Sequence, residues 1–233
     1  MSSHIVRAFD EDLQQLMRRV TDLGSMAERQ IISAVDALIE RGATLAQQVI
    51  TGDQGIDRLQ RDIEEMSVII IARRQPFAVD LREIISALRV SNNLERIGNR
   101  AKSIGRRTIA LHGRSLSQSN MRGIACMADL VLKQLKQVLE SYTRRDAAGA
   151  VTVWLQDERV DAVNNALCAE ILACMAQNPE NVFACTHLLF CAKNLERIGD
   201  HATNIAEIVH YMVHGEPLRQ NRPKADNIRL MPA

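Results

Sequence analysis

The sequence predicts an all-α protein made of two tandem, pseudo-symmetric three-helix bundles. Three observations predict it: a composition typical of helices, an internal repeat, and heptad spacing of apolar residues. Of the 233 residues, 46% are hydrophobic but only 3% are aromatic, and Ala, Leu, Gln, Glu and Arg are residues that favour helices over sheets. Three of the five prolines fall in the last seventeen residues, so helix breakers are rare in the remainder.

The internal repeat divides the chain into similar halves. Asn93–Gly98 recurs as Asn194–Gly199, 101 positions later, and GDQGID (52–57) corresponds to QDERVD (156–161) at an offset of 104. Because the two offsets nearly agree, the halves are copies of one unit with small changes in their loops. We expect a first bundle over residues 1–114, a second over 115–214, and a flexible tail over 215–233, which has no helical period.

Turn-forming residues separate the helices within each half. The first half is expected to form helices over residues 5–40, 43–74 and 77–112, with breaks at ERGAT, RQPF and HGRSLSQSN. The second half is expected to form helices over residues 119–145, 147–177 and 180–214. Long antiparallel helices with short connections make a three-helix bundle, so each half is predicted to be one bundle.

The third helix of each half carries a heptad of apolar residues. Its members in the two halves are Ala87, Val90, Leu94, Ile97, Ala101 and Ile104, and Leu188, Cys191, Leu195, Ile198, Ala202 and Ile205. This stripe is expected to face the bundle core, which turns the acidic residues of the repeat away from it. A mid-helix glycine costs about 1 kcal/mol against alanine, so Gly98 and Gly199 indicate either close approach of another helix, which we favour, or room for a ligand.

Acidic residues recur at a spacing of four on the second and third helices of both halves. They are predicted to form one cluster per half, Asp53, Asp57, Glu95 and Asn99 in the first, and Asp157, Asp161, Glu196 and Asp200 in the second. Like charges about 6 Å apart repel by roughly 3 kcal/mol at an effective dielectric of 20, so such clusters favour bound cations. All-oxygen ligands suit magnesium, manganese, calcium or oxidised iron. The alternative is a solvated face on which Arg96 and Arg197 neutralise the acids.

Composition and charge exclude several classes of function. The formal net charge is +1, with 29 basic and 28 acidic residues, so no basic face proposes a nucleic-acid partner. The apolar run VIIIA (68–72) is too short to cross a bilayer, and the N-terminus lacks a secretory signal, so we expect a cytoplasmic protein. The five cysteines include no CxxC pair and are expected to be buried thiols. No phosphate-binding GxxxxGK[ST] loop is present, and an enzyme is not expected.

The phrase RRQPFAVDLREI (73–84), the LERIG motif used twice, and the paired acids together resemble the PhoU family of accessory and regulatory proteins of bacterial phosphate transport. The resemblance covers residues 5 to about 214. It implies two three-helix bundles related by pseudo-twofold symmetry, with metal ions such as iron, zinc, manganese or magnesium on the acid motifs. The position after the first LERIG is usually acidic in the family but is Asn99 here. Metal is therefore expected to bind more tightly in the second half.

The resemblance also implies a function exerted through partners. It implies negative regulation of high-affinity phosphate uptake and of phosphate-starvation signalling. A homodimer would dock to the ATPase subunit of the phosphate transporter and to the phosphate-sensing histidine kinase, and would reach the membrane only through these partners. The alternative is a di-metal carboxylate oxidoreductase or metal-storage bundle, which needs two Glu-x-x-His elements. Glu207 and His210 form one, but the equivalent first-half residues are Arg106 and Ile109.

Overall fold

The computed structural model describes the backbone of residues 2–218 and the side chains of residues 8–218, and this part of the chain is helical with no strands. The first half contains α1 (Ser2–Glu40), α2 (Ala43–Arg74) and α3 (Ala78–Ala110). The second half contains α4 (Gln118–Arg144), α5 (Ala147–Leu155), α6 (Asp157–Gln177), the short 3-10 helix η1 (Pro179–Asn181) and α7 (Val182–His214). Most of the predicted tail, from residue 219 onward, lies outside the described residues. The predicted all-α class is confirmed.

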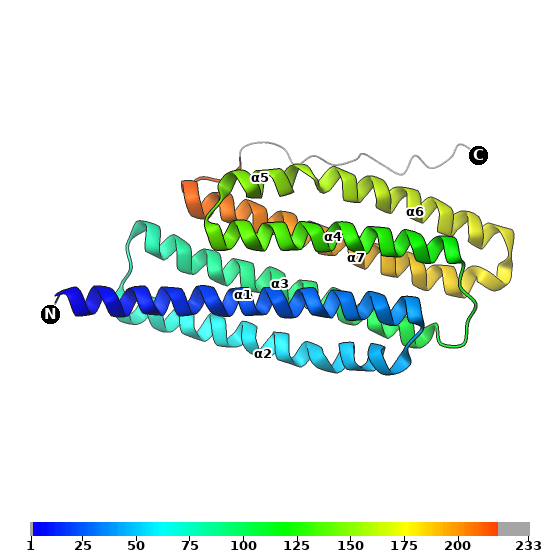
Figure 1. Ribbon diagram of the computed structural model, residues 1–233, viewed down its shortest axis with the longest axis horizontal. Coiled ribbons are helices and arrows are strands. Elements are labelled where there is room, and N and C mark those ends of the chain that lie inside the picture. Colours follow the sequence, from blue (N-terminus) through cyan, green and yellow to red (C-terminus); the bar gives the residue numbers. More distant parts are fainter. Residues whose placement is uncertain (1, 219–233) are drawn as a thin grey trace.

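The helices of each half pack against one another, and the two halves form opposite sides of the molecule (Figure 1). In the first half α1, α2 and α3 contact one another, and in the second half α4, α5 and α6 pack on α7. The predicted heptad of α3 is confirmed, since Val90, Leu94 and Ile97 are fully buried. None of the described helices combines the length and the apolar character that crossing a membrane requires.

One predicted helix is wrong in its continuity. The segment expected as a single helix over residues 147–177 is interrupted at Gln156, whose N–H binds the carbonyl oxygen of Val153 at 3.1 Å and closes α5 with a tight turn. Neither proline nor glycine occurs between residues 151 and 161, so no local signal marks this break. As a result Asp157 lies in the first turn of α6, whereas its counterpart Asp53 lies in the middle of α2.

The two halves meet along α3 and α7, which lie side by side (Figure 1). Three arginines stack on aromatic rings of α7. Arg89 and Arg107 of α3 lie over Tyr211 at 5.9 Å and over Phe190 at 4.4 Å, and Arg114, in the loop after α3, lies over Phe183 at 5.3 Å. Because the α3 numbers rise while the α7 numbers fall, the two helices run antiparallel. The side of each third helix that the heptad leaves free is therefore partly covered by the other half of the chain, a contact that the repeat alone did not predict.

The glycines of the repeated phrase lie where another helix approaches closely. A Cβ atom on Gly98 would lie 2.8 Å from Ile56 Cδ1 of α2, and one on Gly199 would lie 3.3 Å from Val160 Cγ1 of α6. Real Cβ atoms are essentially never closer than 3.0 Å to such a neighbour, and a distance of 3.0–3.4 Å is tighter than nine in ten real contacts. Close helix packing, the favoured interpretation of these glycines, is thus confirmed.

Candidate functional site

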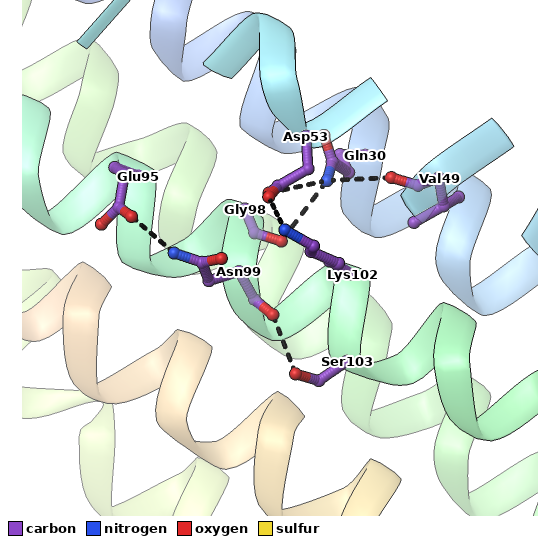
Figure 2. A network of polar contacts seen from close by, with 8 residues as sticks. All are labelled: Gln30, Val49, Asp53, Glu95, Gly98, Asn99, Lys102 and Ser103. Carbon is purple, nitrogen blue, oxygen red and sulfur yellow. Dashed lines mark hydrogen bonds and ion pairs between the residues drawn. The ribbon is translucent and has the colours of Figure 1, made fainter. Parts of the chain in front are cut away.

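Asp53 lies inside the first bundle and not on its surface, where the acid cluster was predicted. Its side chain is fully buried between α1, α2 and α3. Figure 2 shows the carboxylate between two donors: Lys102 Nζ of α3 lies 2.5 Å from Oδ2, and Gln30 Nε2 of α1 lies 3.3 Å from Oδ1. A buried carboxylate without compensation is strongly unfavourable, so the lysine ammonium supplies the countercharge that a metal ion was expected to supply.

Gln30 extends this network to the backbone of the two neighbouring helices. Its Nε2 also lies 3.3 Å from the carbonyl oxygen of Val49 and 3.4 Å from that of Gly98. One amide from α1 thereby contacts α2 and α3 together. Sequence reasoning missed both Gln30 and Lys102. The repeat does contain a signal for Gln30, since this residue recurs 104 positions later as Gln134, and both glutamines are buried.

The other residues of the first predicted cluster lie on the flank of α2 and α3. Asn99 Nδ2 donates a hydrogen bond to Glu95 Oε1 at 2.5 Å (Figure 2). Burial raises the pKa of Glu95, and the neighbouring Asp57 carboxylate raises it further. The structure therefore brings Glu95, Asn99 and Asp57 near one another, while Asp53 faces inward toward Lys102.

Asp157, the counterpart of Asp53, is also buried, with 2% of its surface exposed. Its Oδ1 lies 3.0 Å from the Thr203 hydroxyl, which occupies the position of Lys102 in the repeat and also lies 3.1 Å from the carbonyl oxygen of Gly199. The carboxylate thus meets a neutral donor where the first half has an ammonium group. Its position in the first turn of α6 adds the favourable field of a helix N-terminus.

The remaining second-half residues lie on α6 and α7. Asp161 and Asp200 are half-buried, and Glu196 Oε1 accepts a hydrogen bond from Lys193 Nζ at 2.7 Å. The other oxygen of Glu196 is buried and has no hydrogen-bond partner among the described residues. Both polar atoms of the Gln134 amide are likewise buried without a partner there, in contrast to the three contacts of Gln30.

The residues present determine how well each half suits a cation. Within residues 8–218, no three His, Cys, Asp or Glu side chains converge in an arrangement that would hold a metal ion. The first half does not fit one, because Asp53 is neutralised by Lys102 and Asn99 replaces an acid. In the second half the carboxylates include a buried oxygen of Glu196 that lacks a donor, and this chemistry suits a hard cation. Metal binding there stays a prediction.

The residues of the di-metal alternative point to other partners. Glu207 Oε1 accepts a hydrogen bond from the indole Nε1 of Trp154 at 3.0 Å. His210 lies outside the core, with its Nδ1 3.2 Å from the carbonyl oxygen of Glu216. The two side chains therefore do not combine with the acids of the repeat into a shared site.

Comparison with known proteins identifies similarity along nearly the whole chain. The family model described as the PhoU domain matches residues 20–108 and 124–209. The phosphate-specific transport system accessory protein PhoU homolog of Caulobacter vibrioides (strain NA1000 / CB15N) is 46% identical over 226 residues, which cover 97% of this chain and 98% of the relative. The homolog from Rhizobium meliloti (strain 1021) is 44% identical over 224 residues, covering 96% and 94% respectively.

Solved structures show the same fold. The crystal structure of PhoU from Pseudomonas aeruginosa superposes with a TM-score of 0.86 at 36% identity, covering 89% of this chain and 100% of that one. The phosphate transport system regulatory protein PhoU from Streptococcus pneumoniae superposes with a TM-score of 0.84 at 27% identity, covering 91% and 100%. The pair of predicted helical bundles is consistent with both structures.

Proposed function

The chain belongs to the PhoU family, and we propose that it is an accessory protein of phosphate transport that restrains high-affinity phosphate uptake and phosphate-starvation signalling when phosphate is ample. One observation carries this proposal: the chain matches relatives named as phosphate-specific transport system accessory proteins over nearly their full length. Similarity that includes both halves supports a shared role more strongly than a shared fold alone, because folds are reused for many functions.

The proposed mode of action is docking and not catalysis. The partners are the ATPase subunit of the phosphate transporter and the phosphate-sensing histidine kinase, met in the cytoplasm by a homodimer of this chain. Exposed apolar side chains support docking, since such residues are frequent at protein interfaces when they cluster. Phe77 and Val79 at the start of α3 are 84% and 52% exposed, and Phe183 and Phe190 at the start of α7 are 46% and 48% exposed.

Complementation tests the proposed regulation. The gene is expressed in a bacterial strain that lacks its own PhoU and carries a reporter on a phosphate-regulated promoter, grown at high phosphate. We expect the reporter to be repressed and intracellular phosphate to return to normal. A reporter that stays active while the protein is expressed and helical by circular dichroism would contradict the proposed regulation.

A pull-down with the transporter ATPase tests the docking step separately. We expect Phe77→Ser to weaken capture, because Phe77 is the most exposed large apolar residue within residues 8–218. Leu172→Ser is the matched control, since Leu172 is 50% exposed and lies on α6, in the second half of the chain. Equal capture of wild type and Phe77→Ser would remove this end of α3 from the docking surface, and no capture of wild type would reject the ATPase as a direct partner.

A further inference from the structure

The centre of the α3–α7 interface is occupied by basic side chains that the internal repeat places there. The LERIG phrase contributes Arg96 and Arg197, and four residues after each of them stand Arg100 and His201. Asn93 lies opposite His201 and Asn204, with its Oδ1 3.0 Å from His201 Nδ1, and Arg107 lies against Phe190. Midway between these contacts, Arg100 of α3 falls opposite Arg197 of α7, because the helices are antiparallel.

The three arginines at this centre lack the partners that other arginines of the chain have. Arg74 lies 2.8 Å from an Asp12 oxygen, and Arg145 lies 2.8 Å from a Glu83 oxygen. By contrast Arg96, Arg100 and Arg197 form no hydrogen bond or ion pair with any residue of the described chain. The aromatic stacks that hold Arg89, Arg107 and Arg114 are also missing at the three central arginines.

Arg100 has a buried donor that needs an acceptor. Its Nε is inaccessible to solvent and has no hydrogen-bond partner in the described part of the chain. Leaving such a donor unsatisfied is unfavourable, and more so for a charged group. The contacts of Asn93 with His201 and of Arg107 with Phe190 set Arg100 opposite Arg197. Burial lowers the pKa of Arg100, and the positive charges of Arg197 and then Arg96 lower it further. Glu95 opposes this effect only as the smallest contribution.

Two kinds of external group would satisfy the Arg100 donor. A water molecule would accept its hydrogen bond but would bring no negative charge to the guanidinium groups. An anion with several oxygens would accept hydrogen bonds and neutralise the charge together. Guanidinium groups match the paired oxygens of tetrahedral oxyanions, and such charge-assisted bonds are about twice as strong as neutral ones.

We propose that Arg96, Arg100 and Arg197 form a binding site for a multiply charged oxyanion, of the class of inorganic phosphate or sulfate, between the two bundles. Arg96 and Arg197 are exposed to solvent, and Arg100 is partly buried. The site goes beyond the proposed function, because it requires no partner protein. An anion there would also link α3 to α7 and so stabilise the contact between the halves.

Titration calorimetry of the full chain with inorganic phosphate tests the site, at an ionic strength held constant with sodium chloride. We expect saturable binding that weakens by about tenfold or more in Arg100→Gln and in Arg197→Gln, as the loss of one charge-assisted hydrogen bond predicts. Arg106→Gln is the matched control, because Arg106 is an exposed arginine of α3 outside the cluster. It is expected to bind phosphate as wild type does.

Each outcome decides for or against the site. Binding of phosphate and sulfate alike, or of phosphate alone, supports an oxyanion site and defines its selectivity. The site is overturned if neither anion gives saturable heat, or if Arg106→Gln weakens phosphate binding as much as Arg100→Gln does. It is also overturned if titration with sodium chloride in place of phosphate gives the same heat. Arg197 is exposed, so Arg197→Gln keeps the test valid if Arg100→Gln fails to fold by circular dichroism.

Discussion

The two bundles hold equivalent buried carboxylates by different means. In the first, Asp53 contacts the Lys102 ammonium and the Gln30 amide. In the second, Asp157 contacts the Thr203 hydroxyl. The heptads and glycines of the third helices are common to both halves, whereas the group that compensates the carboxylate is not. The two halves thus share their packing positions but differ in the residue of the third helix that contacts this carboxylate, Lys102 in the first and Thr203 in the second.

The backbone of the second bundle accompanies this difference. α2 passes through Asp53 without interruption, whereas the break at Gln156 starts α6 at Asp157. An acidic side chain in the first turn of a helix is stabilised by about 0.3–1 kcal/mol, and more where it is partly buried. The field at the start of α6 thus stabilises the Asp157 carboxylate, as the Lys102 ammonium group stabilises Asp53 in the first bundle. The break between α5 and α6 therefore has an electrostatic consequence.

Removing the ammonium group should produce the largest effect on stability. Lys102→Met leaves Asp53 charged and buried, so we expect the free energy of unfolding to fall by about 3–5 kcal/mol. Urea denaturation measures it. The double variant Lys102→Met with Asp53→Asn should recover part of the loss, because no buried charge remains. A loss below about 1 kcal/mol in Lys102→Met would mean that the ion pair adds little to the first bundle.

Removing metal ions with a chelator should lower the stability of the protein if the second half binds a cation. At a metal concentration one hundred times Kd, binding adds about 2.7 kcal/mol to stability, so EDTA should lower the melting temperature of wild type accordingly. Asp200→Asn should melt at the same temperature with and without EDTA, whereas Asn93→Ala, a substitution outside the acid set, should keep the EDTA response. Identical melting of wild type with and without EDTA, together with no metal in elemental analysis, would contradict the prediction.

Replacing each of the equivalent glutamines by leucine should change the free energy of unfolding differently in the two bundles. Gln30→Leu removes an amide that contacts Asp53 and two backbone carbonyls, so we expect a loss of about 1–3 kcal/mol. Gln134→Leu replaces a buried amide without partners in the described chain by an apolar group of similar size, and should be neutral or stabilising. Urea denaturation of both variants measures the pair, and equal losses would show that Gln134 is satisfied in solution, by water for example.

The fold was predictable from the sequence, and much of the candidate site was not. Heptad spacing and turn residues identify helices because packing and backbone preference act locally, so α2 was predicted at its observed bounds. Spacing at four residues also places two acids on one helix face, but it does not say what covers that face. Hence Asp53 was expected at the surface, although α1 brings Gln30 and α3 brings Lys102 over it. The break at Gln156 and the α3–α7 contact depend on tertiary packing in the same way.

The smallest expected effects compare three glycine-to-alanine substitutions. Helix propensity alone favours alanine by about 1 kcal/mol, and Gly52→Ala should show that gain, since nothing lies within 4 Å of its added Cβ. Gly98→Ala places Cβ 2.8 Å from the buried Ile56 side chain, and an overpacking penalty of about 1–3 kcal/mol should outweigh the gain. Gly199→Ala, with its nearest atoms at 3.3 Å, should lie between them. Thermal denaturation ranks the three variants. If Gly98→Ala is as stable as Gly52→Ala, then the first bundle has room for a Cβ atom beside Ile56, and the close approach of α2 does not explain the first glycine of the repeat.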